Sequence, residues 1–342
     1  MSMTSRERVL TALRRGVPDR VPYCELGVDR ALAKKVLGWN EEAKVGYDRE
    51  TNQFTVAEAK ELAAALHKDN IAFVLRAPVY AEKVAGQDGR LFYGEGMIKT
   101  EADVDMIQLP DPADDALYVE AADFAANKGD YAAWFITRAG IFPTMLSMGL
   151  ETFSIALYEN RPFVERVLDI YTDWAVAVTR RACKLGFDVY ATTDDMAFKS
   201  APFFSPQVFH ELVMPRYRRV AAEVTLPWVI HSDGNIMPFM DDLVSLGIAG
   251  VHPNEKGAMD PRVTKAKYGD RVCVLGNVDL NLLGMGTPEE VDKEVRALIH
   301  DLGPGGGYIV TSGNSLASYC DAANVRAMAE AVQKYGRYPL QV

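Results

Sequence analysis

Trp228-Val-Ile-His231-Ser-Asp233-Gly234 is a short apolar run that ends in a histidine, a carboxylate and a glycine. The chain has seven further apolar runs, nearly all of which end in a charged or amide side chain: Val21–Gly27, Ile71–Pro78, Trp134–Ile141, Asp188–Asp195, Gly247–Glu255, Val272–Asp279 and Gly307–Asn314. Parallel strands buried on both faces have nearly continuous apolar sequences, so each run predicts one strand. Helical patterns such as Pro162–Leu185 alternate with the runs. We therefore expect a single domain over residues 1–342, an α/β protein with the fold of a (β/α)8 TIM barrel.

The stretch from Ala81 to Lys128 does not follow this alternation. It holds Gly86, Gly89, Gly94 and Gly96, with Phe92 and Tyr93 among them. Long connections of this kind in a compact domain are usually functional. The sequence therefore predicts an insertion after strand 2, a hairpin or lid that covers the mouth of the barrel.

An open, doubly wound sheet is the competing architecture. Such a sheet would need a glycine-rich phosphate-binding turn after its first strand. Here that place reads Gly27-Val-Asp-Arg30, and the glycine-rich segment Gly303-Pro-Gly-Gly-Gly307 precedes its strand instead of following it. The barrel is the better interpretation.

The composition narrows the class of protein. The 342 residues carry a net charge of −10, and 49% are hydrophobic and 25% charged, as in soluble globular proteins. The acidic balance argues against nucleic-acid binding. No apolar stretch approaches the roughly 20 residues that cross a bilayer, and the amphipathic stretch at Ser5–Arg15 lacks the apolar core of a signal peptide. The four cysteines are far apart and predict reduced thiols. We expect a cytoplasmic protein, and a homodimer is an open alternative.

The polar residues at the ends of the runs are the candidates for chemistry, because the carboxyl ends of barrel strands form the active-site face. His231 and Asp233 project to the same side of their strand and could share a metal or form an acid–base pair. Asp233 could also be only the turn into the next helix. Asp194 and Asp195 project in different directions, so one of them is expected to enter the mouth; the alternative is a helix cap or a pairing with Lys199.

Further polar candidates follow the other runs. Glu255 could be a metal ligand, a base or a partner for an arginine, and His252 beside it could be a core histidine. Asn277, Asn314 and Glu25 complete the ring of rim residues. We expect these last three to contact the substrate.

Arginines and aromatic side chains complete the predicted mouth. Arg76 and Arg138 could clamp a carboxylate in bidentate fashion, or they could neutralise the rim acids. Phe142 and Phe198 follow strands three and four, and an aromatic lining suits a flat hydrophobic substrate, although core packing explains part of it. We assign Arg76, Arg138 and Phe198 to substrate binding.

Beyond these residues, the chain resembles the uroporphyrinogen decarboxylase superfamily over nearly its full length. The resembling stretches are Ser5-Arg-Glu-Arg-Val-Leu-Thr-Ala-Leu13, Asp194-Asp-Met-Ala-Phe-Lys199, Ser205-Pro206, His231-Ser-Asp-Gly-Asn235, Gly276-Asn-Val-Asp279, Gly305-Gly-Gly-Tyr-Ile-Val310 and Asn324-Val-Arg-Ala-Met328. The resemblance implies a single α/β barrel and an enzyme, and it leaves the reaction within the superfamily open.

The two main chemistries of the superfamily differ in their signature residues. The decarboxylases carry an arginine-rich R-Q-A-G-R segment after the first strand, whereas Cys24–Asp29 here contains acids. In the cobamide-dependent methyltransferases, an H-x-C motif and a later cysteine bind zinc. His231 matches that histidine, Asp233 stands where the first cysteine would, and Asn314 falls near the second. The resemblance therefore favours the methyltransferase branch, with a site of harder ligands.

This resemblance implies an O-demethylase that passes a methyl group from a methoxylated aromatic compound to the cob(I)amide of a separate corrinoid protein. A cluster of His231, Asp233 and Glu255, bare or around zinc, with Asp194 as a further catalytic group, would activate the leaving oxygen. The alternatives are a decarboxylase of a tetrapyrrole-like substrate and a non-catalytic barrel that binds a corrinoid or tetrapyrrole.

Overall fold

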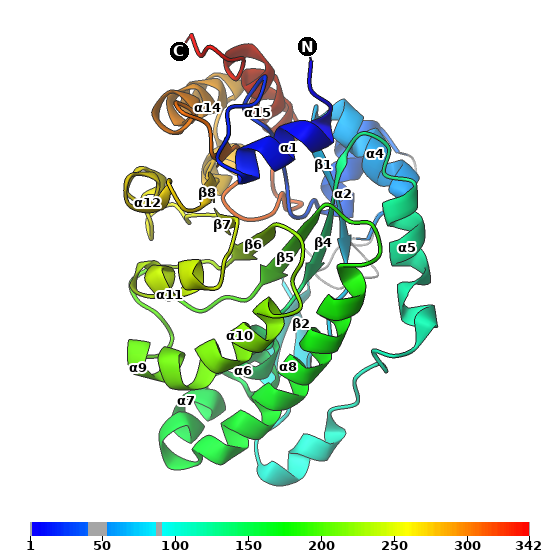
Figure 1. The fold of residues 1–342 in the computed structure, drawn as a ribbon, viewed down its shortest axis with the longest axis vertical. Helices are drawn as coiled ribbons and strands as arrows, with labels where there is room; N and C mark the ends of the chain where they lie inside the picture. Colours follow the sequence, from blue (N-terminus) through cyan, green and yellow to red (C-terminus); the bar gives the residue numbers. More distant parts are fainter. Residues whose placement is uncertain (1, 40–52, 87–90, 342) are drawn as a thin grey trace.

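A parallel sheet of seven strands forms the centre of the structure, a computed structural model that describes residues 2–39, 53–86 and 91–341 (Figure 1). In spatial order the strands are β1 (Asn70–Val74), β4 (Ala132–Thr137), β5 (Val189–Thr193), β6 (Trp228–His231), β7 (Gly250–His252), β8 (Cys273–Leu275) and β9 (Tyr308–Ile309). Each falls within or overlaps one of the predicted apolar runs. The strand order follows the chain order, as expected for successive β/α units.

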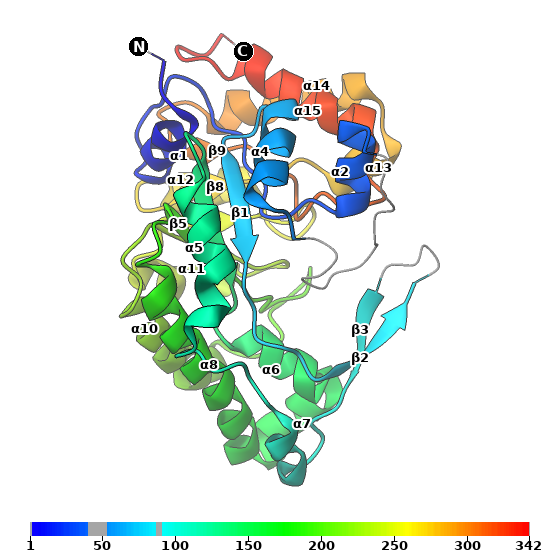
Figure 2. The same cartoon turned by 90° about the vertical axis from the view of Figure 1, so that its right-hand side faces the viewer.

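Helices cover the outer side of this sheet (Figures 1 and 2). They are α1 (Ser5–Leu13), α2 (Arg30–Leu37), α4 (Val56–Ala65), α5 (Val119–Ala126), α6 (Ile141–Met148), α7 (Leu150–Glu159), α8 (Arg161–Ala182), α9 (Pro206–Val208), α10 (Met214–Ala221), α11 (Met240–Ser245), α12 (Pro261–Tyr268), α13 (Leu280–Met285), α14 (Pro288–Leu302) and α15 (Ala322–Tyr335). Local sequence explains several ends. Thr287 caps α14 through a capping box, and Asn160 accepts the amide of Phe163 at the start of α8.

Alternate strand residues bury themselves on opposite faces of the sheet. In β4, Trp134 and Ile136 pack with Val9 and Leu13 of α1 in one core cluster. Phe135, between them, packs in a second, larger cluster with the surrounding helices. Both faces are therefore dry, which explains the continuous apolar runs. The same alternation determines on which face of the sheet the residues that follow each strand place their side chains.

The predicted first strand, residues 21–27, is not a regular strand, so the sheet has seven named strands instead of the expected eight. The segment still lies between β9 and β1: the Cys24 amide donates to the Val310 carbonyl at 3.0 Å, and the Asp69 amide donates to the Tyr23 carbonyl at 2.7 Å. Regular pairing fails because a side chain replaces the backbone partner. The Glu25 amide donates to Asn70 Oδ1 at 3.0 Å, and Asn70 Nδ2 donates back to the Glu25 carbonyl at 2.9 Å.

An antiparallel hairpin, β2 (Ala81–Ala85) and β3 (Leu91–Gly96), follows β1. Figure 2 shows it projecting beside the sheet, next to α6 and α7. Its base is anchored there, because the Ile98 amide donates to the Ser147 carbonyl at 2.8 Å. A hairpin was predicted in this stretch, although Gly89 lies outside the described residues.

The helix predicted between Ser205 and Val224 is interrupted. A π-helical turn, Phe209–Val213, separates α9 from α10. Pro215 in the first turn of α10 has no amide hydrogen, and the Met214 amide reaches back to the Phe209 carbonyl. The wider turn accommodates the proline.

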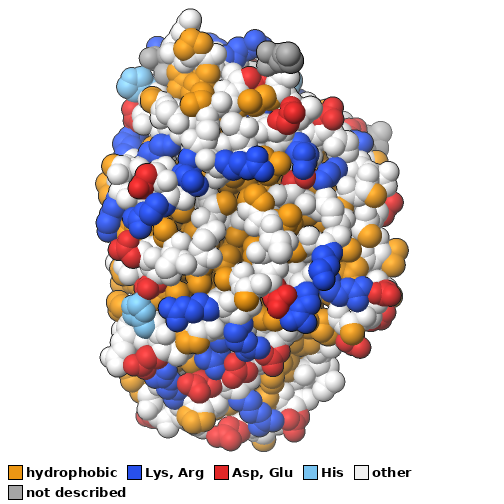
Figure 3. Space-filling model, in the orientation of Figure 1, with side chains coloured by type: hydrophobic (Ala, Val, Ile, Leu, Met, Phe, Trp, Pro, Cys, Tyr) orange, Lys and Arg blue, Asp and Glu red, His pale blue; other side chains and the backbone are white. Residues whose placement is uncertain are grey.

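On the face shown in Figure 3, Lys and Arg side chains are interspersed with Asp and Glu. Within the described residues, no helix taken singly has both the length and the apolar character needed to span a membrane. The consecutive helices α6 and α7 meet those requirements only together, and they are bent by 102°.

Candidate active site

Four neighbouring strands deliver polar side chains to one edge of the sheet. Arg76 comes two residues after β1, Arg138 directly after β4, Asp195 two residues after β5, and His231 is the last residue of β6. The strand register pairs Thr193 with His231. Because carboxyl ends of parallel strands meet at one edge, these groups lie at the same level of the molecule.

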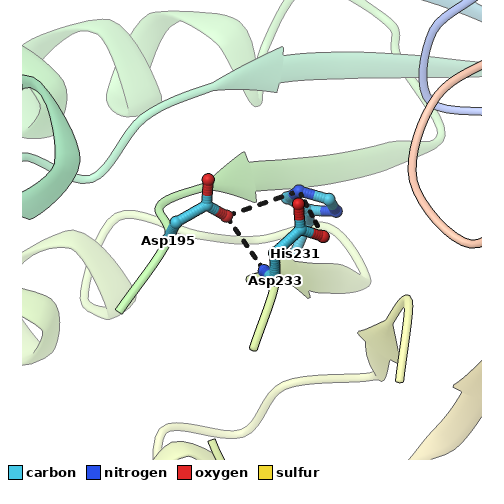
Figure 4. Close-up of side chains that lie close together, drawn as sticks. All are labelled: Asp195, His231 and Asp233. Atoms are coloured by element: carbon cyan, nitrogen blue, oxygen red, sulfur yellow. Dashed lines mark hydrogen bonds and ion pairs between the residues drawn. The ribbon is translucent and has the colours of Figure 1, made fainter. Parts of the chain in front are cut away.

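His231 lies beside Asp195 and Asp233 (Figure 4). Its Nε2 atom is 3.6 Å from Asp195 Oδ1 and 3.8 Å from Asp233 Oδ1. Asp195 Oδ1 also accepts the Asp233 amide at 2.9 Å, so it links the ends of β5 and β6. Burial is the main cause that lowers the pKa of His231, and the attraction of Asp195 opposes it. The imidazole is therefore neutral at physiological pH.

The other ring nitrogen of His231 faces a second histidine. The Nδ1 atoms of His231 and His252 are 2.7 Å apart, and His252 is fully buried. Burial, followed by the His231 charge, lowers the pKa of His252 well below its usual value. Two neutral imidazoles at this distance share one N–H, so His252 fixes the tautomer of His231.

The two carboxylate oxygens of Asp233 differ in their hydrogen bonding. Asn314 Nδ2 donates a short hydrogen bond to Asp233 Oδ2. Asp233 Oδ1 is buried and has no hydrogen-bond partner among the residues that the structure describes. Burial, and then the charges of Asp195 and Glu255, raise the pKa of Asp233 to about 8. The free oxygen can thus hold a proton or a cation beside His231.

Asp194 does not join this group, and Asp195 takes the place expected for it. Asp194 turns to the opposite side, where it accepts the backbone amides of Ala139 at 2.6 Å, Phe142 at 3.0 Å and Gly140 at 3.3 Å. Of the two interpretations, the helix cap is correct, because these amides lie at the start of α6. Its carboxylate is therefore structural.

Glu255 lies beside the group without a ligand atom in it. Its Oε2 atom accepts the Gly234 amide at 2.7 Å, and its Oε1 atom is 3.5 Å from Lys199 Nζ. Glu255 therefore supports the loop after β6, and its ion-pair partner is a lysine where an arginine had been considered. Of the predicted metal set His231, Asp233 and Glu255, the third position is corrected, because Asp195 provides the third donor atom in place of Glu255.

A cavity of about 790 Å³ opens in front of these side chains. Its lining residues include Glu25, Arg76, Arg138, Asp195, His231 and Asn314, together with Phe92, Tyr93 and Phe142. Two of the predicted substrate contacts do not line it. Phe198 is 66% exposed at the surface, and Asn277 donates to the Asn254 carbonyl and faces a different pocket.

Glu25 lines the cavity but its carboxylate is already satisfied. Both oxygens accept from Ser312, one from the amide at 2.9 Å and the other from the hydroxyl at 2.6 Å. Burial raises the pKa of Glu25 to about 7. Glu25 thus connects residues 21–27 to Ser312, which follows β9.

A metal ion would find its donors in Asp195, His231 and Asp233. One ligand atom from each lies within 4.8 Å of the other two. The unpartnered Asp233 Oδ1 and the Nε2 face of His231 suit a cation of the zinc class with one nitrogen and two oxygen ligands. Cys24, Cys273 and Cys320 are buried in the core and form no disulfide. The donor set therefore fits a metal without thiolates.

The sequence interpretation considered both Asp194 and Asp195 but assigned the catalytic role to Asp194, and it left His252 undecided. In the structure Val189 and Ala191 belong to the inner cluster, and strand alternation then places residues 193 and 195 on the same side. No sequence signal pointed to the pairing of His252 with His231.

Comparison with known proteins places this geometry in a family. The uroporphyrinogen decarboxylase (URO-D) family matches residues 93–335. A methylcobamide:CoM methyltransferase from Methanosarcina barkeri is 26% identical over 50% of the chain, a match that spans about half (49%) of that relative. A uroporphyrinogen decarboxylase from Alkalilimnicola ehrlichii is 24% identical over 98% of the chain and 95% of its own length. A solved methyltransferase from Methanosarcina mazei has the same fold, with a TM-score of 0.74, 19% identity and coverage of 98% and 99%.

Proposed function

The chain belongs to the uroporphyrinogen decarboxylase family, and we propose that within this family it is a methyltransferase. It would move a methyl group from a methoxylated aromatic compound to the cob(I)amide of a corrinoid protein. One observation carries this proposal. His231 and Asn314, far apart in sequence, line one cavity together with Phe92, Tyr93 and other aromatic side chains, and Asp233 lies beside both of them. A relative that acts on methylcobamide supports methyl transfer over other reactions.

The protein's task is to help the aryl oxygen leave. The cob(I)amide of the partner would supply the nucleophile for the methyl carbon, and the C–O bond electrons pass to the oxygen. A phenolate is a poor leaving group, so the oxygen needs a proton or a cation. Asp233, with a pKa of about 8, carries a proton at neutral pH and can donate it from Oδ1. The Asp233 amide donates to Asp195 Oδ1 and Asn314 Nδ2 donates to Asp233 Oδ2, and these two contacts hold the carboxyl group beside His231.

A zinc ion in the same group is the second route to an activated oxygen. Asp195, His231 and Asp233 would hold it, and it would act as a Lewis acid toward the ether oxygen. In that case Asp233 is ionised, and His252 keeps the shared proton on His231 Nδ1 so that Nε2 is free to bind. Elemental analysis of the purified protein distinguishes the two routes.

Methyl transfer to free cob(I)alamin tests the function. We expect loss of the cob(I) absorbance with methoxybenzoates, together with release of the matching phenol. His231→Ala should lower this rate about 100-fold or more. His300→Ala, an exposed histidine of α14, is the matched control. Absence of phenol release from any methoxyarene would refute the proposal.

Decarboxylation of a tetrapyrrole is the second candidate, because a uroporphyrinogen decarboxylase matches nearly the full chain. The segment Cys24–Asp29 supplies no arginine for the substrate carboxylates, and the cavity's two arginines, Arg76 and Arg138, come from other strands. Formation of coproporphyrinogen from uroporphyrinogen would favour this function over methyl transfer.

We also propose that the sheet is a (β/α)8 barrel whose eighth position is held by residues 21–27, and that the β2–β3 hairpin is an insertion over its mouth. The hydrogen bonds of this segment to Val310 and Asp69 support the first part. The position of Phe92 and Tyr93 in the cavity lining supports the second.

A further inference from the structure

We infer that Arg76 and Arg138 form an anion subsite that binds the carboxylate of an aromatic acid, so that the substrate is a methoxybenzoate and not a neutral aryl ether. This inference rests on the proposed function and names its substrate class. Both arginines line the same cavity as His231. Arg138 is only 8% exposed, and within the described part of the chain the buried Nε atoms of both arginines have no hydrogen-bond partner.

The other role considered for these arginines was to neutralise the acids of the rim. Over the described ranges 2–39, 53–86 and 91–341, neither guanidinium forms an ion pair with a carboxylate. Asp194, which could have paired with them, is occupied by three backbone amides. Asp195 instead interacts with His231 and the Asp233 amide. The two positive charges are left for something that enters the cavity.

The contacts that the arginines do make hold them for such a ligand. Arg76 Nη2 donates to Thr193 Oγ1 at 3.0 Å. The Arg138 guanidinium lies over the Phe142 ring at 4.9 Å and near the Tyr93 ring at 6.0 Å. A ring fixes the plane of a guanidinium and leaves its N–H edge free, which is the edge that binds a carboxylate through two hydrogen bonds.

Two neighbouring cations, Arg138 buried and Arg76 half-buried, repel one another when no anion lies between them. Burial and the neighbouring Arg138 charge lower the pKa of Arg76 to about 9. A carboxylate between them would remove this repulsion and provide acceptors for the unpartnered Nε atoms. Binding would therefore gain from both charge and hydrogen bonding.

The order of the strands gives the proposed orientation of the ligand. Arg138 follows β4 and His231 ends β6, with β5 between them. The carboxylate of a methoxybenzoate would contact the arginines, and a methoxy group at the 3- or 4-position of the ring would face His231.

Calorimetric binding of 4-methoxybenzoate and its neutral isostere 4-methoxybenzamide tests the subsite without any methyl transfer. A charge-assisted bidentate contact predicts about 10- to 100-fold tighter binding of the benzoate. Arg138→Gln and Arg76→Gln should each remove most of this preference. Arg296→Gln, on the exposed face of α14, should leave it unchanged. Equal binding of the acid and the amide to the unaltered protein would overturn the inference, even if both variants failed to fold.

Tetrapyrrole carboxylates offer the same chemistry, so a porphyrin tetracarboxylate serves as a second probe. Arginine-dependent binding of coproporphyrin in place of 4-methoxybenzoate would overturn the assigned substrate class. Arginine-dependent binding of the benzoate without methyl transfer to cob(I)alamin would support the subsite and refute the proposed function. Equally fast demethylation of the benzoate and the benzamide would refute the subsite and support the function.

Discussion

Replacement of Asp233 by asparagine should stabilise the metal-free protein, and increasingly so as the pH rises. The pKa of Asp233 is raised from 3.8 to about 8 in the folded protein. Between these values the folded state holds a proton that the unfolded chain has released, so wild-type stability falls with increasing pH. The full shift corresponds to about 6 kcal/mol at 1.36 kcal/mol per unit. The side chain is 27% exposed, so solvent screens part of the effect and we expect about half of this or less, roughly 2–3 kcal/mol.

Urea unfolding of EDTA-treated protein at about pH 5 and about pH 8 measures this effect. The advantage of Asp233→Asn over the wild type should grow by roughly 1–2 kcal/mol between the two pH values, since part of the effect is already present at about pH 5. An asparagine oxygen can still accept from Asn314 Nδ2, so the packing is preserved. Asp270→Asn, an 80% exposed carboxylate, is the control and should show no such trend. A pH-independent difference, or a variant less stable at pH 8, would refute the assigned burial of the Asp233 charge.

Three further outcomes follow from the contacts of the site. If zinc binds, Asp195→Asn should reduce the zinc content of the purified protein at least 10-fold. Glu255→Gln should leave the zinc content unchanged, because Glu255 lies outside the donor set. The reverse pattern would restore Glu255 as a ligand. His231→Ala should lower methyl transfer about 100-fold while the melting temperature stays within a few degrees, and full activity would remove His231 from the reaction. Asp194→Ala should cost about 3 kcal/mol in the free energy of unfolding, because it leaves three amides at the start of α6 without an acceptor; an unchanged urea midpoint would contradict that cap.

The strands were predictable because their burial on both faces leaves a strong local signal. Runs such as Trp134–Ile141 contain β4 without a polar interruption. The first run was different, since Glu25 and Asn70 exchange backbone hydrogen bonds for side-chain ones. Asn70 lies 45 positions from Glu25 in the sequence, so this change of hydrogen-bond partner cannot be predicted from the residues around Glu25.

The site was predictable to the level of strand ends but not to the level of side-chain direction. A strand that is apolar on both faces does not reveal which of its two alternating sets faces inward. The choice of Asp194 over Asp195 failed for this reason, whereas the HxD spacing placed His231 and Asp233 on one side whichever set faced inward. Glu255 was misplaced because its contact with the Gly234 amide depends on the path of a loop.

The arginines and the acid–histidine group act on one another through the cavity. The charges of Arg76 and Arg138 are among the causes that lower the pKa of His231. A bound carboxylate would neutralise those charges, and the proton affinity of His231 and its partners would rise. Substrate binding at one end of the cavity would thus prepare the other end to hold the proton that the leaving oxygen requires. A thiolate-containing metal site would lack this response, since zinc-bound thiolates stay deprotonated. Under the proposed function, the oxygen and amide groups of Asp233 and Asn314 therefore suit an oxygen leaving group.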